Sequence, residues 1–300
     1  MTHLNGVLVV DKPENISSAG AVGILKRMLK AKKIGHTGTL DPFATGVLVC
    51  CINKATRLAK FFLKSNKTYE AVLVLGASTD TQDRTGRIVA TSNEPDVTPE
   101  MIQDAFNRFV GPIHQRPPVY SALKHKGVPL YKLARSGKTV QKPARAVSIH
   151  RLDLLHFHLP EVRFRVHCSA GTYIRTLCAD IGDFLGCGGF LRDLRRIESG
   201  GFTIDEALSL DGIEAIAESG RIDECVISMK DALKTMPTYI AGDELAEKIK
   251  NGRVLHTEDV KLPQDHNGLL KIVDNRQLLL AVVECGIKSN HYAYCCVLTE

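Results

Sequence analysis

The sequence predicts an α+β fold, and three observations support this. Val7–Val10 and Val47–Ile52 are short apolar runs with the β-branched content of buried strands. Val162–Cys168 alternates apolar with basic side chains, as expected of a strand with one buried face. Thr98–Glu100 opens a helix to about Val110, with an N-cap, a proline in the first turn and an acid at the positive end of the helix dipole.

Composition places the chain among globular proteins of one large domain or two smaller ones. Its 300 residues are 44% hydrophobic and 24% charged, with a net charge of +6. No run approaches membrane-spanning length, and the N-terminus lacks the pattern of a secretory leader. None of the nine cysteines forms a Cys-x-x-Cys pair, so we expect reduced, buried thiols in a cytoplasmic protein.

The first strand is followed by a turn and a helix. Ser17 or Ser18 can cap a helix that continues to about Lys30. Asn15 occupies the turn before it, and asparagine tolerates a positive φ better than most residues. Lys12 either supports the loop described next or is a surface lysine beside a turn.

The segment Gly35–Gly46 reads Gly-His-Thr-Gly-Thr-Leu-Asp-Pro-Phe-Ala-Thr-Gly and is predicted to be a shaped loop. Its glycines and proline rule out a regular helix or strand, and Pro42 restricts the direction of the Asp41 carboxylate. Three interpretations are open. An Asp-Pro turn is the simplest. A phosphate cradle would need a Gly-Lys-Ser/Thr ending, which is absent, and Asp41 would repel the phosphate. The third is a catalytic loop that presents one acid.

The next segment is predicted to contain a short helix, a strand and a polar turn. The helix covers Thr56–Phe62 and the strand covers Lys67–Gly76. The turn Ser78–Gly86 has two acids but lacks the spaced ligands and closing glutamate of a calcium-binding EF-hand.

Positive charge is concentrated in one block. Between Ala105 and Leu152 there are ten Lys or Arg residues and no Asp or Glu. Because the whole chain carries +6 and this block +10, the remainder carries −4. Tyr120 and Tyr131 add aromatic surfaces on which bases can stack. We expect a nucleic-acid contact here; the alternative is a solvated basic face, although such faces usually mix both signs.

Two strands and a helix follow the basic block. The first strand, Val147–Leu159, carries His156 and His158 on one face, but no carboxylate or cysteine completes a metal motif. The helix begins near Tyr173 and runs to about Leu185. Arg175 lies in its first turn, where the helix dipole disfavours a cation unless an anion is near, and Asp41 could be that anion.

A second, smaller unit is predicted at the C-terminus. Helical pieces between 205 and 233 end at a break at Met236-Pro237. A helix over 243–251, stopped by Gly252, and several short strands follow. The domain boundary is therefore placed between 234 and 235.

The loop Gly35–Gly46 resembles the signature loop of the TruB family of tRNA pseudouridine synthases, and several other segments resemble family motifs in the same order. Asn15 departs from the glycine usual at its position. The further matching segments are Asp11–Ser18, Tyr69, Thr79–Gly86, Gln115–Lys124, Leu130–Gly137, Gly171–Leu177 and Gly186–Ile197.

This resemblance implies a fold and a division into domains. Residues 1–234 would form a pseudouridine synthase domain with a central mixed, mostly antiparallel sheet flanked by helices. Its segment 115–145 would be a basic RNA-binding thumb. The size and element order of 235–300 resemble a small β-rich PUA RNA-binding module.

The resemblance also implies roles for individual residues. Asp41 would be the catalytic carboxylate, paired with Arg175, while Tyr69 stacks on the target base and Tyr173 assists proton transfer. His36 would help to displace the base. The remaining substrate-binding residues would be Arg57, Asp83, Lys124, Lys126, Lys132, Leu194 and Arg196, with Arg57 the basic companion of Asp83.

The function implied is isomerisation of uridine 55 in the tRNA T loop to pseudouridine after base flipping. Neither a cofactor nor a metal is expected, because the reaction needs no oxidant or energy source. The Thr79–Gly86 turn favours a stand-alone enzyme that acts as a monomer on tRNA, without guide RNA, protein partner or membrane. The alternative is a non-catalytic RNA-binding or tRNA-folding protein on the same scaffold.

Overall fold

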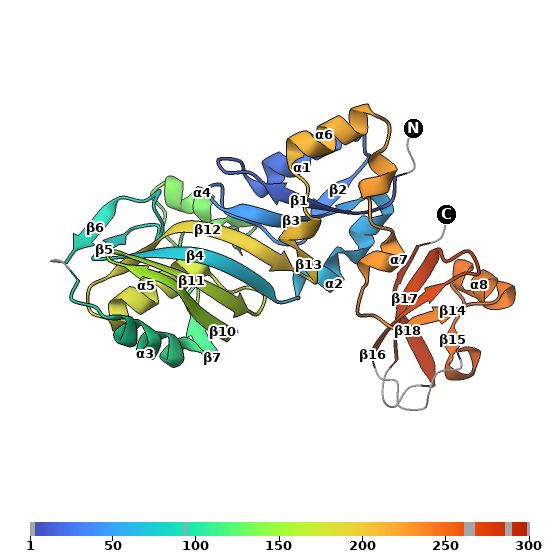
Figure 1. Ribbon diagram of the computed structural model, residues 1–300. Helices are drawn as coiled ribbons and strands as arrows, with labels where there is room; N and C mark the ends of the chain where they lie inside the picture. The colour runs from blue at the N-terminus through green and yellow to red at the C-terminus, as the bar shows by residue number, and fades with distance from the viewer. Residues whose placement is uncertain (1–3, 93–94, 261–267, 286–289, 299–300) are drawn as a thin grey trace.

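The computed structural model describes residues 4–92, 95–260, 268–285 and 290–298. These residues form a large elongated domain and a smaller β-rich domain at the C-terminus, which lies beside one end of the large domain (Figure 1). The predicted α+β class is confirmed.

Among the described residues, a nine-stranded sheet forms the centre of the large domain. Its main strand order is β1-β3-β12-β4-β11-β10-β7, with β2 paired to β3 and β13 paired to β12. Every neighbouring pair is antiparallel except β3 and β12, so the expected mixed, mostly antiparallel sheet is present. The strands are β1 (Gly6–Lys12), β2 (Ile34–His36), β3 (Thr45–Ile52), β4 (Lys67–Leu75), β7 (Gly111–Gln115), β10 (Arg145–His158), β11 (Glu161–Cys168), β12 (Gly189–Ser199) and β13 (Phe202–Thr203).

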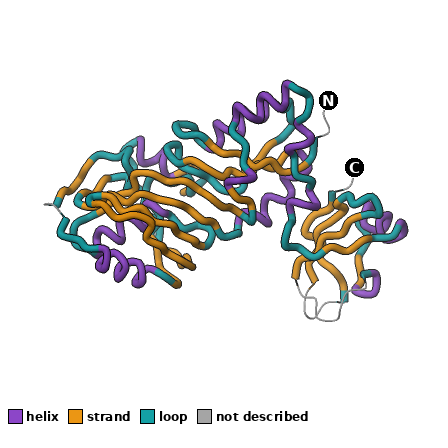
Figure 2. The backbone as a smooth tube through the Cα atoms, in the orientation of Figure 1, coloured by secondary structure: helices purple, strands orange, loops and turns teal. Residues whose placement is uncertain are grey.

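Helices flank this sheet (Figure 2), and two hairpins among the described residues form separate two-stranded sheets. The helices are α1 (Ser18–Met28), α2 (Ala59–Leu63), α3 (Pro99–Phe109), α4 (Leu130–Arg135), α5 (Ile174–Phe184), α6 (Leu210–Glu218) and α7 (Met229–Ala232). The 3-10 helices are η1 (Asn53–Leu58), η2 (Ile204–Glu206) and η3 (Ile222–Cys225). The hairpins pair β5 (Ala77–Thr79) with β6 (Ile88–Thr91) and β8 (Lys124–His125) with β9 (Val128–Pro129).

Local sequence signals account for several boundaries. Ser17 caps α1 by accepting a hydrogen bond from the Gly20 amide, and Thr98 caps α3 in the same way. Asn15 has a φ of 63°, so the turn before α1 survives without glycine. The single helix expected over Thr56–Phe62 is instead η1 followed by α2.

Strands β1 and β3 are buried on both faces, which explains why their sequences are continuously apolar. Leu8 and Val10 pack with helices α1 and α6 on one face. Val7 and Val9 point to the other face, where they join a cluster that includes Phe62 and residues of the C-terminal domain. The two-residue period of a strand therefore separates two hydrophobic cores.

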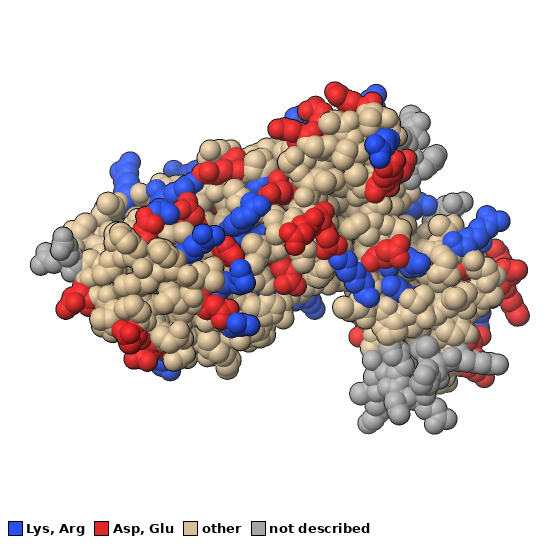
Figure 3. Space-filling view, viewed as in Figure 1, with Lys and Arg blue, Asp and Glu red and all other residues tan. Residues whose placement is uncertain are grey.

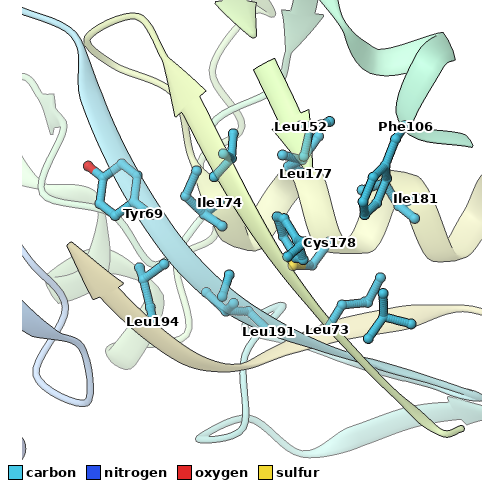
Figure 4. Packing of buried hydrophobic residues seen from close by; sticks show 14 of the residues in the cluster. Tyr69, Leu73, Phe106, Leu152, Ile174, Leu177, Cys178, Ile181, Leu191 and Leu194 are labelled. Atoms are coloured by element: carbon cyan, nitrogen blue, oxygen red, sulfur yellow. The ribbon is translucent and has the colours of Figure 1, made fainter. Parts of the chain in front are cut away.

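The largest core lies between the other half of the sheet and helices α3 and α5. Figure 4 shows Phe106 and Ile181 at one end of this cluster and Tyr69 with Leu194 at the other. Tyr69 lies opposite Arg196 on β12 and opposite Val166 on β11. The Tyr69 end of the core is the end that borders the cavity described below.

In its described residues, the C-terminal domain is a five-stranded sheet with one α-helix, α8 (Asp243–Lys250). Its strand order is β14-β16-β17-β18-β15. Val273, Leu279, Val282 and Leu298 extend from it into the core beneath β1 and β3, so the two domains share one hydrophobic cluster. The strands are β14 (Thr238–Ile240), β15 (Leu255–His256), β16 (Gly268–Val273), β17 (Leu279–Cys285) and β18 (His291–Val297), and η4 (Thr257–Asp259) follows β15.

Three further features bear on the expectations from sequence. Among the described residues, no helix is both long enough and apolar enough to cross a membrane. In the same part of the chain, no three His, Cys, Asp or Glu side chains are grouped as metal ligands, which includes His156 and His158. The cysteines whose side chains are described are free thiols, namely Cys50, Cys51, Cys168, Cys178, Cys187, Cys225, Cys295 and Cys296. Cys50 and Cys51 are fully buried, as expected.

Candidate active site

The loop that carries Asp41 lies between β2 and β3 and is fixed from several sides. The Ser18 hydroxyl accepts a hydrogen bond from the Leu40 amide at 2.8 Å. The buried Lys12 ammonium donates to Pro42 O at 3.3 Å, and the Arg196 guanidinium donates to Gly38 O at 3.0 Å. Lys12 thus supports the loop rather than lying on the surface. Because these hydrogen bonds fix the loop, they also fix the position of Asp41.

Gly46 closes this loop at a position that only glycine can occupy. Its φ is +100°, and a Cβ there would lie 2.2 Å from the carbonyl oxygen of Arg196 on the parallel neighbour β12. The close approach brings β12 against β3, so that Arg196 reaches the Asp41 loop.

Arg175, in the first turn of α5, meets Asp41 as predicted from its position against the helix dipole. The Nε of Arg175 lies 3.0 Å from Asp41 Oδ2, and its Nη2 donates to Asp41 Oδ1 at 3.3 Å. The Arg175 side chain is 5% exposed and that of Asp41 33%, so the carboxylate is the accessible half of the pair. A fork-to-fork contact of this kind fixes both direction and distance.

Asp83 holds the same guanidinium from the opposite side. Its Oδ2 lies 3.3 Å from Arg175 Nη1. The other oxygen, Oδ1, accepts hydrogen bonds from the Thr81 hydroxyl at 2.8 Å and from the Thr85 amide at 2.9 Å. Asp83 is 3% exposed and does not line the cavity described below, so it orients Arg175 instead of contacting a ligand, which corrects the substrate-binding role expected for it.

Burial and charge have opposite effects on the ionisation of Asp41. Burial is the largest influence and raises the pKa of the Asp41 carboxyl above its usual range, the charge of Arg175 lowers it, Asp83 raises it and Lys12 lowers it. The net direction is upward, so the expected ion pair exists but Arg175 does not dominate the pKa. Burial also lowers the pKa of Lys12 to about 8.

A cavity of ≈320 Å³ opens beside Asp41, within the size range of ligand pockets, roughly 300–1,000 Å³. Among the described residues that line it, Asp41 is the only carboxylate. The cations that line it are Lys67, Arg145, Arg175 and Arg196. The cavity therefore suits a ligand that is anionic overall and needs one acid for chemistry.

Tyr69, Tyr173 and Leu194 all line this cavity. Figure 4 shows the Tyr69 hydroxyl turned away from the hydrophobic cluster and Leu194 close to the Tyr69 ring on the neighbouring strand. Tyr69 is 7% exposed, and burial raises the pKa of its hydroxyl, so it stays neutral. The cavity thus has an aromatic face and an aliphatic wall.

Gln115, the last residue of β7, is a supporting residue that sequence analysis did not assign. Its side-chain oxygen accepts from the Tyr173 amide at 3.0 Å, and its side-chain nitrogen donates to the Tyr173 carbonyl at 3.2 Å. Gln115 is 1% exposed, so this amide clamp fixes Tyr173 at the start of α5. Its one signal in the sequence was its place at the start of Gln115–Lys124, a segment that resembles a family motif.

The remaining predicted substrate-binding residues lie at different distances from the cavity. Arg196 is buried at its wall and also donates to Val47 O at 2.6 Å. His36 is the last residue of β2, so the start of the predicted loop Gly35–Gly46 is a strand paired with β3; burial lowers the pKa of the His36 imidazole. Lys124, Lys126 and Lys132 are exposed on the segment 115–145, outside the cavity lining.

Arg57 does not accompany Asp83, which corrects the expectation. It is exposed at the end of η1, and its guanidinium donates to Val297 O in the C-terminal domain. Lys60 makes a similar contact to Cys295 O. Both side chains thus point toward the domain junction, Arg57 from η1 and Lys60 from α2, so Arg57 joins the domains instead of shaping the cavity.

Comparison with known proteins gives matches over most of the chain. Residues 26–174 match the TruB family pseudouridylate synthase N-terminal domain, and residues 175–234 match the tRNA pseudouridylate synthase B C-terminal domain. A tRNA pseudouridine synthase B of Syntrophotalea carbinolica is 48% identical over 78% of this chain and 76% of its own length. The protein of the same name from Francisella philomiragia is 40% identical over 92% of this chain and 90% of its own length.

Solved structures extend the likeness to the whole fold. A Cbf5-Nop10-Gar1 complex contains a chain that is similar to this one with a TM-score of 0.76 and 26% identity, covering 98% of this chain and 85% of its own length. That coverage includes the C-terminal domain. With an Asp-Arg pair at a cationic cavity, and with matches at up to 48% identity, this chain belongs to the TruB family of pseudouridylate synthases.

Proposed function

We propose that this protein converts uridine to pseudouridine in tRNA, at position 55 of the T loop, with Asp41 as the catalytic carboxylate. The observation that carries the proposal is the placement of one accessible carboxylate against Arg175 in a cationic cavity. Relatives named tRNA pseudouridine synthase B, at 40–48% identity, support the substrate class.

The reaction is an isomerisation, so its atoms balance without a co-reactant. The bond between uracil N1 and ribose C1′ breaks, the base turns, and a bond from C5 to C1′ forms; the C5 proton leaves and N1 gains a proton. Asp41 acts at the ribose, as nucleophile at C1′ or as base toward a ribose proton, and both roles need it ionised. Tyr173, clamped by Gln115 at the cavity, assists the proton transfer that completes the product.

The base must leave its stack before Asp41 can reach the ribose, at a cost of a few kcal/mol. Tyr69 offers the extruded base an aromatic face, and Leu194 offers an apolar wall. His36 helps to displace the base from the RNA; its lowered pKa keeps the imidazole neutral at pH 7. Arg175 and Asp83 hold Asp41 in place, and Arg196 fixes the loop that carries it.

The RNA surface extends beyond the cavity. In this proposal residues 1–234 form the catalytic domain, and segment 115–145 is the thumb whose exposed Lys124, Lys126 and Lys132 contact RNA phosphates. Residues 235–300 form a PUA-like RNA-binding domain held against the catalytic domain by the shared core. The enzyme acts in the cytoplasm as a monomer, without guide RNA, protein partner, cofactor or metal.

The test uses purified protein and a tRNA transcript with no other component. We expect pseudouridine to form at position 55 with the native chain, and Asp41→Asn to bind the transcript with near-native affinity while product falls below detection. Retained turnover in Asp41→Asn would refute the catalytic assignment. Binding without product in the native chain would favour a non-catalytic RNA-binding or tRNA-folding protein instead.

A further inference from the structure

Three polar atoms near Asp41 are buried without a hydrogen-bond partner within the described chain. They are Thr37 Oγ1, Ser121 Oγ and Arg145 Nε. Thr37 is 1% exposed and Ser121 4% exposed. All three residues line the cavity beside Asp41, although they come from the Asp41 loop, the thumb segment and the start of β10.

The location of these three unpaired atoms at one cavity bears on ligand binding. A buried donor or acceptor without a partner destabilises a folded protein, so most such groups are paired. Here the unpaired atoms converge on one cavity from distant parts of the chain, Thr37 from the Asp41 loop and Ser121 and Arg145 from near the two ends of segment 115–145. This pattern fits groups kept free for a ligand.

The two hydroxyls are held in place by their backbones. The Ser121 carbonyl accepts from the Tyr131 amide at 3.0 Å, and the carbonyl of Tyr120 accepts from Arg175 Nη2 at 3.0 Å. The Thr37 amide donates to Val49 O at 3.1 Å. The guanidinium that holds Asp41 thus also fixes the thumb next to Ser121, and both hydroxyls have defined positions relative to the carboxylate.

Arg145 is a cation that is anchored but not neutralised. Its Nη2 donates to Gly171 O at 2.9 Å, and its guanidinium carbon lies 5.1 Å from the centre of the Tyr173 ring. No acidic side chain in the described part of the chain pairs with it. A guanidinium in this state is suited to a phosphodiester oxygen.

We propose that Thr37, Ser121 and Arg145 are substrate-binding residues of the extruded nucleotide. The two hydroxyls bind its uncharged polar atoms, and Arg145 binds a phosphodiester adjacent to the target ribose. This assignment rests on the proposed function, since it takes RNA as the ligand of the cavity.

The hydroxyls are tested with Ser121→Ala and Thr37→Val. Each removes an unpaired buried group, so we expect the melting temperature to stay or rise while kcat/KM on the tRNA transcript falls about 3- to 10-fold, the range of one hydrogen bond. Ser209→Ala is the matched control, because the Ser209 hydroxyl accepts from the Gly212 amide at 3.1 Å at the start of α6. It should lower the melting temperature and leave kcat/KM unchanged.

Arg145 is tested with Arg145→Met and a T-stem-loop RNA carrying single methylphosphonates around the target uridine. At one of these positions the methylphosphonate should lower the affinity of the native protein for the RNA several-fold. The same methylphosphonate should leave the affinity of Arg145→Met unchanged. Arg221→Gln, which removes an exposed charge paired with Glu224, should respond to that methylphosphonate like the native chain.

The outcomes separate this inference from the proposed function. If native protein forms pseudouridine while Ser121→Ala and Thr37→Val keep native kcat/KM, the hydroxyl assignment is wrong and the enzyme assignment stands. Equal losses for native protein and Arg145→Met at every methylphosphonate would overturn the phosphate contact. Absence of product in the native protein would instead sink the proposed function.

Discussion

Arginine and carboxylate side chains meet on both faces of the large sheet, in very different surroundings. On the α5 side, Arg175 holds Asp41 and Asp83 at 3.0 and 3.3 Å with its own side chain 5% exposed. On the other face, Glu70 accepts from Arg163 at 2.8 Å and from Arg165 at 2.7 Å, and both arginine side chains are about half exposed. Figure 3 shows a face of the large domain on which Lys and Arg lie beside Asp and Glu in this manner.

The pKa of the paired carboxylate is shifted in opposite directions on the two faces. Hydrogen bonds from Arg165 and then Arg163 lower the pKa of Glu70, with burial opposing them. Burial raises the pKa of Asp41 although Arg175 contacts both of its oxygens. Glu70 has two arginine partners, whereas Asp41 has one and lies near the negative charge of Asp83, but the loss of water is the largest influence on the pKa of Asp41. A buried pair can therefore hold a reactive carboxylate in place while leaving it protonatable.

The largest difference between the faces is expected when an arginine is removed. Arg175→Met leaves Asp41 and Asp83 close together without their shared cation, so we expect unfolding free energy to fall by about 3–5 kcal/mol, as for a broken buried pair. The yield of pseudouridine should fall by roughly two to three orders of magnitude, because Asp41 loses its orientation. Urea denaturation and single-turnover assays measure the two effects.

Arg163→Met on the exposed face is the control for this change. Removing the Arg163 guanidinium should lower the unfolding free energy by no more than about 1 kcal/mol and leave the rate of pseudouridine formation unchanged. Similar stability losses for Arg163→Met and Arg175→Met would show that burial does not distinguish the two faces.

Much of the buried site was predictable because its residues carry local signals. Asp41 stands in a loop that contains Gly38 and Pro42, and Arg175 lies where a helix dipole disfavours a cation. The predicted loop was too long at both ends, because Gly35 lies in β2 and Gly46 in β3. The strand Val162–Cys168 was predictable from alternation, since one face is packed and the other is wet. In each case the physical constraint acts within a few residues.

Contacts to distant backbone carbonyls were not predictable. Arg57 reaches Val297 O, 240 positions away, and the buried Lys271 donates to Leu233 O at 2.9 Å. Every residue offers a carbonyl, so a sequence does not mark which one will accept. Gln115 escaped assignment for the same reason, because it binds the backbone of Tyr173 and not its side chain.

Exposed lysines without an ion pair are a third kind of charge in this comparison. We expect their removal to have an effect between those of the Arg175 and the Glu70 variants. Lys124, Lys126 and Lys132 have no salt bridge to any described acid, unlike the arginines near Glu70. Changing all three to Gln should lower the slope of log affinity against log salt by about 2, at roughly 0.7 per phosphate contact for single strands. Filter binding of tRNA over a salt series measures this, and an unchanged slope would remove the segment from the RNA interface.

The pH dependence of kcat/KM tests how neighbouring charges act on Asp41. Two variants are expected to shift it in opposite directions. In the proposed mechanism activity needs ionised Asp41, whose pKa is raised, so kcat/KM should fall as pH drops through a value above the usual aspartate range. Arg175→Lys weakens the contact that lowers this pKa and should move the acidic limb to higher pH. Asp83→Asn removes a neighbouring negative charge and should move it to lower pH, although both variants are slower. Shifts in the same direction would contradict the assignment of the limb to Asp41.

The smallest effect is expected at Glu70. Because the folded-state pKa of Glu70 is lowered, its ion pairs stabilise the protein above the pKa of the unfolded chain, about 4.3, and this contribution is lost as pH falls through the folded value. Glu70→Gln should therefore cost at most about 1 kcal/mol at pH 7, and this cost should shrink as pH falls below the pKa of the unfolded chain, with pseudouridine formation unchanged at pH 7. Urea denaturation over a series of pH values measures the change in unfolding free energy. A cost that does not shrink with falling pH would mean that Glu70 stabilises the sheet by packing or neutral hydrogen bonds, and the two faces would then differ in more than the exposure of their ion pairs.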